Sequence, residues 1–266
     1  MLLAIEVGNS TTHCGLYDHG SPALRASFRL STDRARTPDE WLALLAALMA
    51  NDGLQPGDID AVIVSSVVPS VTSWLDEMSQ RRLGIAPLVV GPDLDLGIQL
   101  LVDEPEKVGA DRIVDCIATH ARYGGPAIII DLGTATTFDV TDESGNYLGG
   151  VIAAGIGTTL KALSGNAAQL FAVEMRLPDA PIGKTTADQI RGGIVLGHLA
   201  MMEGMIERLR AAAGGSAVTI LTGGYAPLFA GQSPLFDHVD TDLTVDGLRM
   251  IWERVRERHH HEEGAG

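Results

Sequence analysis

The sequence has few of the features that mark several common classes of protein. Only two cysteines, Cys14 and Cys116, occur among 266 residues, and no Cys/His spacing typical of a metal site surrounds either one. We therefore expect two buried free thiols and a reducing, cytoplasmic environment. No basic stretch precedes an apolar one at the N-terminus, and no apolar run has the length of a membrane span. We thus expect neither a secretory leader nor a membrane-spanning segment.

Positive charge is also scarce. The chain has 19 Lys and Arg residues against 34 Asp and Glu residues, a formal net charge of -15, and no basic run. This charge would repel a nucleic-acid backbone or an anionic membrane surface, so neither is an expected partner. A small anion such as a nucleotide is compatible with it, because backbone N–H groups and a metal ion neutralise phosphate locally. Residues 257–266, charged and without apolar periodicity, predict a flexible tail.

A first series of strands and helices is predicted before residue 91. Three short apolar runs between residues 2 and 30 are typical of an antiparallel meander. Thr37 and Glu40 have the spacing of a capping box, with Pro38 at the first helical position, which predicts a helix starting there. Two buried parallel strands with a helix between them follow, so one β-β-β-α-β-α-β unit is complete by Val90.

The second half of the sequence repeats the first. An apolar run carrying Asp131 and then Gly133 resembles the opening run, which carries Glu6 and then Gly8. The same ungapped alignment matches two further pairs, Thr11 with Thr136 and Thr12 with Thr137. We therefore predict two α/β subdomains of like topology, residues 1–118 and 119–256, each bringing an acidic hairpin to a shared cleft.

The paired acidic hairpins predict a nucleotide site. A carboxylate at the end of a central strand, followed by a glycine turn, offers an oxygen ligand for Mg²⁺ or its waters and backbone donors for phosphate. Tight hairpin geometry alone also favours such glycines, but it does not require an acid in both strands. The matched pair therefore favours a nucleoside triphosphate held by the two hairpins.

Asp111 and Arg112 stand at the start of a helix predicted over residues 110–124. As a first-turn acid, Asp111 could simply complement the helix dipole, and Arg112 could form a surface ion pair. In a phosphoryl-transfer site, Asp111 would accept the proton of the attacking hydroxyl, while Arg112 would hold a substrate carboxylate.

Thr186 precedes a long apolar helix and has capping-box spacing with Gln189. Capping is the role that the sequence alone favours for this threonine. A helix of a second subunit could pack closely on the small-residue face formed by Gly192, Gly193 and Gly197.

Seven motifs occur in order along the chain: EVGNS, VGADR, DLGTATTFD, GGVIAAG, IGKTT, TGG and LTVDGLRMIWER. From Leu2 to about Val255 they resemble the type III pantothenate kinases, a family of the actin/Hsp70/sugar kinase superfamily. The resemblance implies an α/β fold with two duplicated ribonuclease H-like subdomains and an inter-domain cleft. It also implies transfer of the ATP γ-phosphate to pantothenate, giving 4′-phosphopantothenate, the first step of coenzyme A biosynthesis.

The same resemblance implies cofactors, partners and site residues. Family members are cytoplasmic homodimers that need Mg²⁺ or another divalent cation and K⁺ or NH₄⁺. Asp131 would bind the monovalent cation, and Glu6 could bind Mg²⁺ or its water. The implied ATP-binding residues are Glu6, Val7, Gly8, Asn9, Ser10, Thr11, Thr12, His13 and Thr134. The implied substrate-binding residues are Val102, Gly109, Ala110, Asp111, Arg112 and Thr186, with Asp111 as the catalytic base.

Three positions depart from the family pattern. Glu6 stands where Asp is usual, and its extra methylene moves the carboxylate about 1.5 Å further along the side chain. Val102 stands where many members have Tyr, and Ala154 where Pro is usual. The alternative reading is a non-catalytic nucleotide-binding paralogue, regulatory or accessory, with the same fold. A third is another kinase or phosphatase of the superfamily, which would need substrate contacts outside the VGADR motif.

Overall fold

The computed structural model describes residues 1–91, 94, 96–166 and 171–264, and the chain divides into two compact units. The first unit comprises Met1–Ile98, Glu104–Ala118 and Asp242–Gly266, and the second comprises Gln99–Asp103 and Thr119–Thr241. The expected grouping of residues 242–256 with the second half is therefore wrong. This closing segment belongs to the first unit because it packs on the first sheet.

Five strands form the sheet of the first unit, in the order β3-β2-β1-β4-β5. They are β1 (Leu2–Val7), β2 (Thr11–Tyr17), β3 (Leu24–Ser31), β4 (Ala61–Ser66) and β5 (Leu88–Val89). The first three strands form the predicted antiparallel meander, and β4 and β5 continue the sheet in parallel. The central strand β1 is buried on both faces, which explains its unbroken apolar run up to Glu6.

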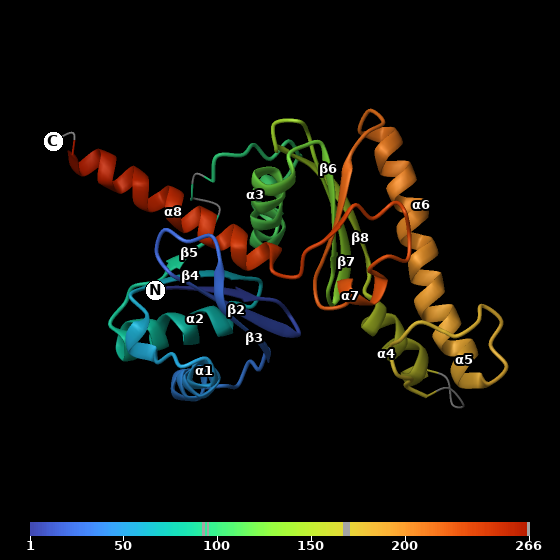
Figure 1. The fold of residues 1–266 in the computed structure, drawn as a ribbon, viewed down its shortest axis with the longest axis horizontal. Helices are drawn as coiled ribbons and strands as arrows, with labels where there is room; N and C mark the ends of the chain where they lie inside the picture. The colour runs from blue at the N-terminus through green and yellow to red at the C-terminus, as the bar shows by residue number, and fades with distance from the viewer. Residues whose placement is uncertain (92–93, 95, 167–170, 265–266) are drawn as a thin grey trace. The chain divides into compact units, whose positions relative to one another are not determined.

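Helices cover the two faces of this sheet (Figure 1). One face carries α1 (Pro38–Asn51) and α2 (Pro69–Met78), which a π-helical turn, η2 (Ser79–Leu83), extends. The other face carries α8 (Leu243–Gly264), whose Gly247 packs against Val114 of α3 (Ala110–Tyr123). Two short 3-10 turns, η1 (Pro56–Asp58) and η3 (Pro105–Lys107), complete this part of the chain. The helix α8 extends to Gly264, so it includes most of the expected tail, and residues 265–266 lie outside the described residues. The flexibility of this tail stays a prediction.

The predicted capping box at the start of α1 is present. The N–H of Glu40 donates to Thr37 Oγ1 at 3.4 Å, and the N–H of Thr37 donates to Glu40 Oε2 at 2.8 Å. The helix then buries Trp41, Leu45 and Met49 against the sheet.

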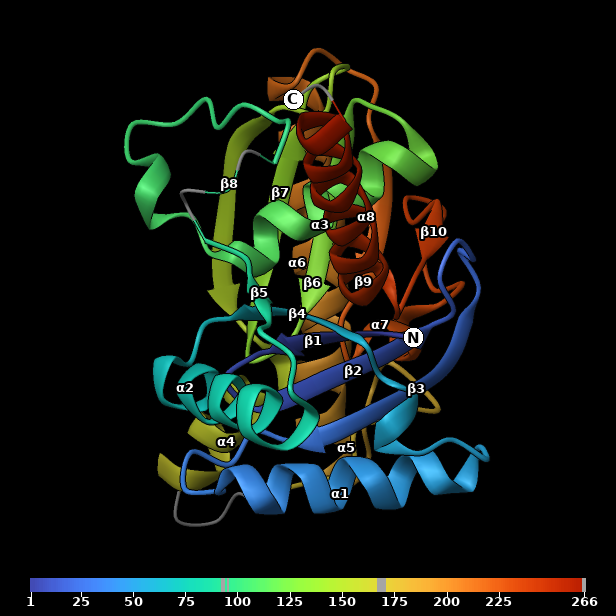
Figure 2. The same ribbon diagram turned by 90° about the vertical axis from the view of Figure 1, so that its left-hand side faces the viewer.

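Five strands also form the sheet of the second unit, in the order β10-β9-β6-β7-β8 (Figure 2). They are β6 (Ala127–Leu132), β7 (Ala135–Thr141), β8 (Tyr147–Ala154), β9 (Val218–Thr222) and β10 (His238–Val239). With β6 in the place of β1 and β9 in the place of β4, this order and the strand directions repeat those of the first sheet. The predicted duplication is confirmed.

One long helix lies along the second sheet. It runs without a break in helical backbone through α5 (Thr186–Arg191), the π-helical turn η4 (Gly192–Leu196) and α6 (Gly197–Ala212). The shorter helices of this unit are α4 (Ile156–Asn166) and α7 (Ala226–Phe229). The helix cap differs from the prediction: Thr185 is the N-cap and accepts the N–H of Asp188 at 3.2 Å, so Thr186 is the first helical residue. The capping pair is one residue earlier than predicted.

The two acidic hairpins differ by one residue in their turns. Val7 pairs with Thr12 across the first hairpin, which leaves residues 8–11 as the turn. Leu132 pairs with Thr136 across the second, which leaves residues 133–135. The ungapped alignment is therefore wrong beyond the turn, and Thr12 corresponds to Thr136. Both of these threonine side chains are completely buried.

Two further expectations concern the cysteines and the helices. Cys14 and Cys116 are buried and free, as predicted. Burial raises the pKa of the Cys14 thiol to about 12, and the nearby Glu6 carboxylate adds to this effect. Within the described ranges, no helix is both long enough and apolar enough to cross a bilayer.

Replacing Thr37 with Ala should destabilise the first unit. The substitution removes the hydroxyl that accepts the Glu40 N–H, so we expect the free energy of unfolding to fall by about 1 kcal/mol. Thr37→Ser keeps the hydroxyl and should stay close to the parent. Urea unfolding followed by circular dichroism measures both variants, and an unchanged Thr37→Ala midpoint would contradict the assignment.

Candidate active site

Glu6, near the end of β1, lies next to a turn whose first residue is glycine. Glu6 is partly buried on β1 and pairs with His13 on β2 and Ser65 on β4. A Cβ at Gly8 would lie 3.1 Å from Glu6 Oε1, so the glycine leaves the space beside the carboxylate open. The Gly8 N–H donates to Thr11 O at 3.0 Å and closes the turn. The carboxylate therefore stands beside the turn.

Thr32, directly after β3, holds this turn from outside the hairpin. Its hydroxyl donates to Gly8 O at 2.7 Å, and its N–H donates to Ser10 O at 3.0 Å. Its Oγ1 also lies 2.9 Å from Thr12 Oγ1. The remaining turn residues, Asn9, Ser10 and Thr11, are exposed. The hairpin thus presents polar groups to solvent on a backbone that a neighbouring segment fixes.

The His13 ring is held inside the first unit and is only 5% exposed. Its Nε2 lies 2.8 Å from Ser27 Oγ and 3.3 Å from Asp242 Oδ1, and its Nδ1 lies 3.4 Å from Arg29 Nη2. Because a guanidinium only donates, Nδ1 accepts from Arg29 and Nε2 carries the proton. Burial lowers the pKa of His13, which favours the neutral ring, although the Asp242 bond opposes the shift. The imidazole therefore joins two strands to the start of α8.

The second acidic strand end is enclosed by two glycines. Asp131 is partly buried on β6, and a Cβ at Gly133 would lie 3.6 Å from Asp131 Oδ2. Gly223 follows β9 with a φ of 87°, and a Cβ there would collide with Asp131 Oδ1 and with the backbone N of Leu132. Only glycine satisfies both the backbone conformation and the close approach. The turn after β9, which contains the TGG motif, therefore packs directly on the end of β6 that carries Asp131.

The turn of the second hairpin is fixed by the segment that starts α4. The carbonyl of Thr134 accepts the hydroxyl of Thr158 at 2.6 Å and the N–H of Gly155 at 3.2 Å. A Cβ at Gly155 would collide with the carbonyl oxygens of Gly133 and Thr134. Ala154, the last residue of β8, precedes this contact. The exposed Thr134 side chain therefore stands on a turn whose carbonyls are packed from behind.

Asp111 lies in the first turn of α3. Its Oδ1 accepts the N–H of Arg112 at 2.9 Å. Burial raises the pKa of the Asp111 carboxyl, and the Arg112 contact only partly offsets this. A Cβ at Gly109 would lie 2.5 Å from Asp111 Oδ1, so a side chain there would displace the carboxylate from this position. A carboxylate with a raised pKa is a better proton acceptor than an ordinary surface aspartate.

The remaining predicted substrate residues occupy different elements. Gly109, Ala110 and Arg112 surround Asp111 in the first unit. Val102 belongs to the second unit, where a Cβ at Gly149 would lie 3.7 Å from its Cγ1. Thr186, the first residue of α5, is exposed.

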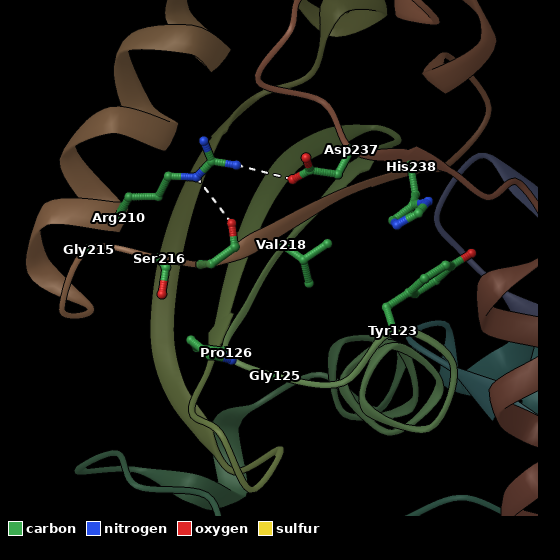
Figure 3. A pocket seen from close by; sticks show the side chains of 10 residues that line it. Tyr123, Gly125, Pro126, Arg210, Gly215, Ser216, Val218, Asp237 and His238 are labelled. Atoms are coloured by element: carbon green, nitrogen blue, oxygen red, sulfur yellow. Dashed lines mark hydrogen bonds and ion pairs between the residues drawn. The ribbon is translucent and has the colours of Figure 1, made fainter.

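A pocket of about 580 Å³ opens at the amino ends of β6, β9 and β10 (Figure 3). Arg210 and Asp237 form an ion pair of 3.1 Å on one side, and the rings of Tyr123 and His238 stack on the other with centroids 4.4 Å apart. None of the predicted site residues lines it. The turns that contain Gly133 and Gly223 follow the carboxyl ends of β6 and β9. The pocket therefore lies at the opposite end of these strands from the two turns.

The sequence model of the type III pantothenate kinases matches residues 2–208. The chain belongs to this family. The type III pantothenate kinase of Rhodospirillum rubrum is 46% identical over 255 residues, which are 96% of this chain and 98% of that protein. The type III pantothenate kinase of Thermomicrobium roseum is 43% identical with the same shares covered. The resemblance that the motifs indicated is confirmed over nearly the whole chain.

Solved structures show the same fold. A putative Baf family transcriptional activator from Campylobacter jejuni has a TM-score of 0.60 and 19% identity, over 96% of this chain and 99% of that one. An activator of 2-hydroxyisocaproyl-CoA dehydratase from Clostridium difficile, solved with bound ADPNP, has a TM-score of 0.54 and 11% identity, over 98% and 97%. With the repeated strand order, these likenesses confirm the predicted α/β fold of two duplicated subdomains.

Several residues that shape the hairpins of this type III pantothenate kinase family member were not predicted. Thr32, Asp242, Thr158 and His198 each bind a hairpin residue through a side chain. Their positions follow no motif or periodicity. Only a fold that brings distant segments together identifies them.

Replacing Gly109 with Ala should move the Asp111 carboxylate. The new Cβ would need the space 2.5 Å from Asp111 Oδ1, and a displacement of about 1 Å in an active site lowers turnover by about 100-fold. Gly57→Ala is the matched control, because a Cβ there meets open space. Steady-state kinetics on both folded variants is the measurement, and equal turnover numbers would show that the Gly109–Asp111 contact has no role in the reaction.

Proposed function

We propose that the protein is a pantothenate kinase, which transfers the γ-phosphate of ATP to the primary hydroxyl of pantothenate. The observation that carries the proposal is family membership: relatives named type III pantothenate kinase are 46% and 43% identical over 96% of this chain. The paired carboxylate and glycine turns support it, since they have the chemistry that a nucleoside triphosphate needs.

The proposed reaction is an in-line phosphoryl transfer without a phosphorylated protein intermediate. The hydroxyl oxygen of pantothenate attacks the γ-phosphorus, and the bond from this phosphorus to the bridging oxygen of ADP breaks. Asp111 takes the hydroxyl proton, which its raised pKa favours, while Arg112 binds the substrate carboxylate. Val102, Gly109, Ala110 and Thr186 complete the proposed pantothenate contacts.

The proposed ATP contacts come from the two turns. Residues 6–13 bind the phosphates through the exposed Asn9, Ser10 and Thr11 and through backbone groups, with the His13 ring in a supporting role. Val7 and Thr12 are buried, so they contribute backbone. Thr134 contributes from the second turn.

The residues at the first hairpin fit a divalent cation. Within the described residues, no three His, Cys, Asp or Glu side chains gather as metal ligands. Mg²⁺ commonly takes one or two protein carboxylates and fills its other positions with water and phosphate oxygens. The partly buried Glu6 carboxylate beside the turn suits that arrangement, directly or through a water. When bound, Mg²⁺ would neutralise charge on the phosphates.

Asp131 is the proposed ligand of a monovalent cation, K⁺ or NH₄⁺. It is a partly buried carboxylate, and the missing side chains of Gly133 and Gly223 leave it close to backbone. A cytoplasmic homodimer completes the proposal on the family resemblance. Exposed apolar side chains of the second unit, among them Ile152 and Ile182, suit a subunit contact, which light scattering would detect.

The direct test is formation of phosphopantothenate from ATP and pantothenate with Mg²⁺, with and without K⁺. Product that increases with K⁺ supports both the reaction and the monovalent-cation site. A folded protein that binds ATP but makes no product with saturating pantothenate would instead favour the non-catalytic paralogue.

The proton-accepting role of Asp111 predicts a pH dependence. Protonation removes the acceptor, so kcat/KM should fall as the pH drops through the raised pKa of this carboxyl. In a plot of kcat/KM against pH, the midpoint of the acidic limb should therefore lie above about pH 3.9, the ordinary pKa of aspartate. Asp111→Asn should lower kcat by at least about 100-fold with little change in ATP affinity, whereas the exposed Asp18→Asn should match the parent. Full turnover in Asp111→Asn would exclude this residue as the base.

Glu6 should tolerate shortening but not loss of its carboxylate. Glu6→Asp restores the acid usual in the family and should keep or raise activity. Glu6→Ala should lower kcat by about 100-fold, because the metal-linked phosphates lose their protein carboxylate. The assay is run over a range of Mg²⁺ concentrations, and equal rates for the three proteins would remove Glu6 from the metal site.

A further inference from the structure

A buried histidine reaches the second hairpin from the long helix of the second unit. His198 Nε2 lies 2.9 Å from Thr136 Oγ1. His198 is 7% exposed and Thr136 is completely buried, so both polar groups are withdrawn from water. Burial also lowers the pKa of His198, which keeps the ring neutral at pH 7. A pair of this kind remains stable only because each partner satisfies the other.

The contact lies at the point where the hairpin closes. Thr136 pairs with Leu132 across the strands, and Thr134, the proposed ATP contact, lies midway between them. Side chains alternate along a strand, so Thr136 shares its face with Phe138 and Val140, which belong to the apolar core. The hydroxyl is thus a polar group on an apolar face, and valine would satisfy core packing equally well. A hydrogen bond there serves to orient the strand.

The helix holds the histidine in a defined orientation. The π-helical turn η4 (Gly192–Leu196) directly precedes α6, and its extra residue turns the following side chains by about 100° relative to a regular helix. The His198 ring packs near Phe229 with centroids 6.0 Å apart and an interplanar angle of 30°. The imidazole is therefore fixed both by its helix and by an aromatic neighbour.

The first hairpin has a matching arrangement. Thr12, the counterpart of Thr136, is also completely buried, and its hydroxyl lies 2.9 Å from Thr32 Oγ1. Thr32 in turn donates to Gly8 O in the turn. Each hairpin therefore has a buried threonine where its second strand begins and a side chain from outside that binds it. The partner is a hydroxyl in the first unit and an imidazole in the second.

We propose that His198 is a positioning residue for ATP. By binding Thr136 it fixes the start of β7, and so holds the turn that carries Thr134 in the geometry that contacts the nucleotide. The inference rests on the proposed function, because it assumes that the second turn binds ATP. It predicts that losing the contact weakens ATP binding selectively and leaves pantothenate binding unchanged.

The test removes the hydrogen bond from each side while keeping the shape. Thr136→Val replaces the hydroxyl with a methyl group, and His198→Phe keeps a ring but removes its nitrogens. Each should raise KM for ATP by about 3- to 10-fold, the range expected for one buried hydrogen bond, with KM for pantothenate within about twofold of the parent. Thr136→Ser and His198→Gln each keep a polar atom and should restore KM for ATP to within about twofold.

Thr141→Val is the matched control. Thr141 is equally buried at the other end of β7, and within the described residues its hydroxyl has no hydrogen-bond partner. The same substitution there should leave both KM values unchanged. The Thr136→Val/His198→Phe double variant should lose no more ATP affinity than either single variant, because both remove one shared contact.

Direct titration with ADPNP separates this inference from the proposed function. If the parent protein makes no phosphopantothenate, the function fails, but weaker ADPNP binding by Thr136→Val and His198→Phe would still support the positioning role. Unchanged ADPNP affinity in both folded variants would overturn it. A loss that is additive in the double variant, or equal for ATP and pantothenate, would also overturn it.

Discussion

The approach of a carboxylate to a turn that begins with glycine is the constraint on which both units depend. A carboxylate on a central strand loses hydration that the protein must replace, and such a strand is otherwise apolar. Glu6 and Asp131 meet this requirement only at the end of the strand, where each remains partly exposed. The glycines beside them, Gly8 and Gly223, leave room that any side chain would fill. The duplication of the fold is therefore also a duplication of this local arrangement.

An acid and a glycine alone do not make a good phosphate site. If the turn is mobile before binding, it must be ordered when phosphate binds, and this loss of entropy lowers the affinity. Segments that follow each hairpin in the sequence supply the rigidity. Thr32 binds the first turn, and Thr158 and His198 bind the second. The long helix of the second unit is thereby joined to the second hairpin through one imidazole. Asp111, whose carboxyl has a pKa raised by burial, lies in the first turn of α3.

Local patterns allowed a large part of the fold to be predicted. The meander and the Thr37 capping box depend on residues close together in the chain, and the matched acids depend on a repeated motif, so the sequence shows them directly. The predictions were wrong where two adjacent residues suit the same role equally well, or where packing between distant segments determines the structure. Thr185 and Thr186 both suit an N-cap, and the turns differ by a residue that an ungapped alignment does not detect. The charged C-terminal segment lacks apolar periodicity, yet α8 continues into it as far as Gly264.

The sequence by itself determined the first series of strands and helices, the duplication and the family, because these follow from apolar periodicity, turn residues and motif order. Only the tertiary structure decided that the His13 ring is held between Arg29 and Asp242, that α8 belongs to the first unit, and that His198 binds Thr136. The physical reason is distance along the chain. Side-chain hydrogen bonds between remote segments, and the burial that shifts a pKa, arise from packing that no local pattern encodes.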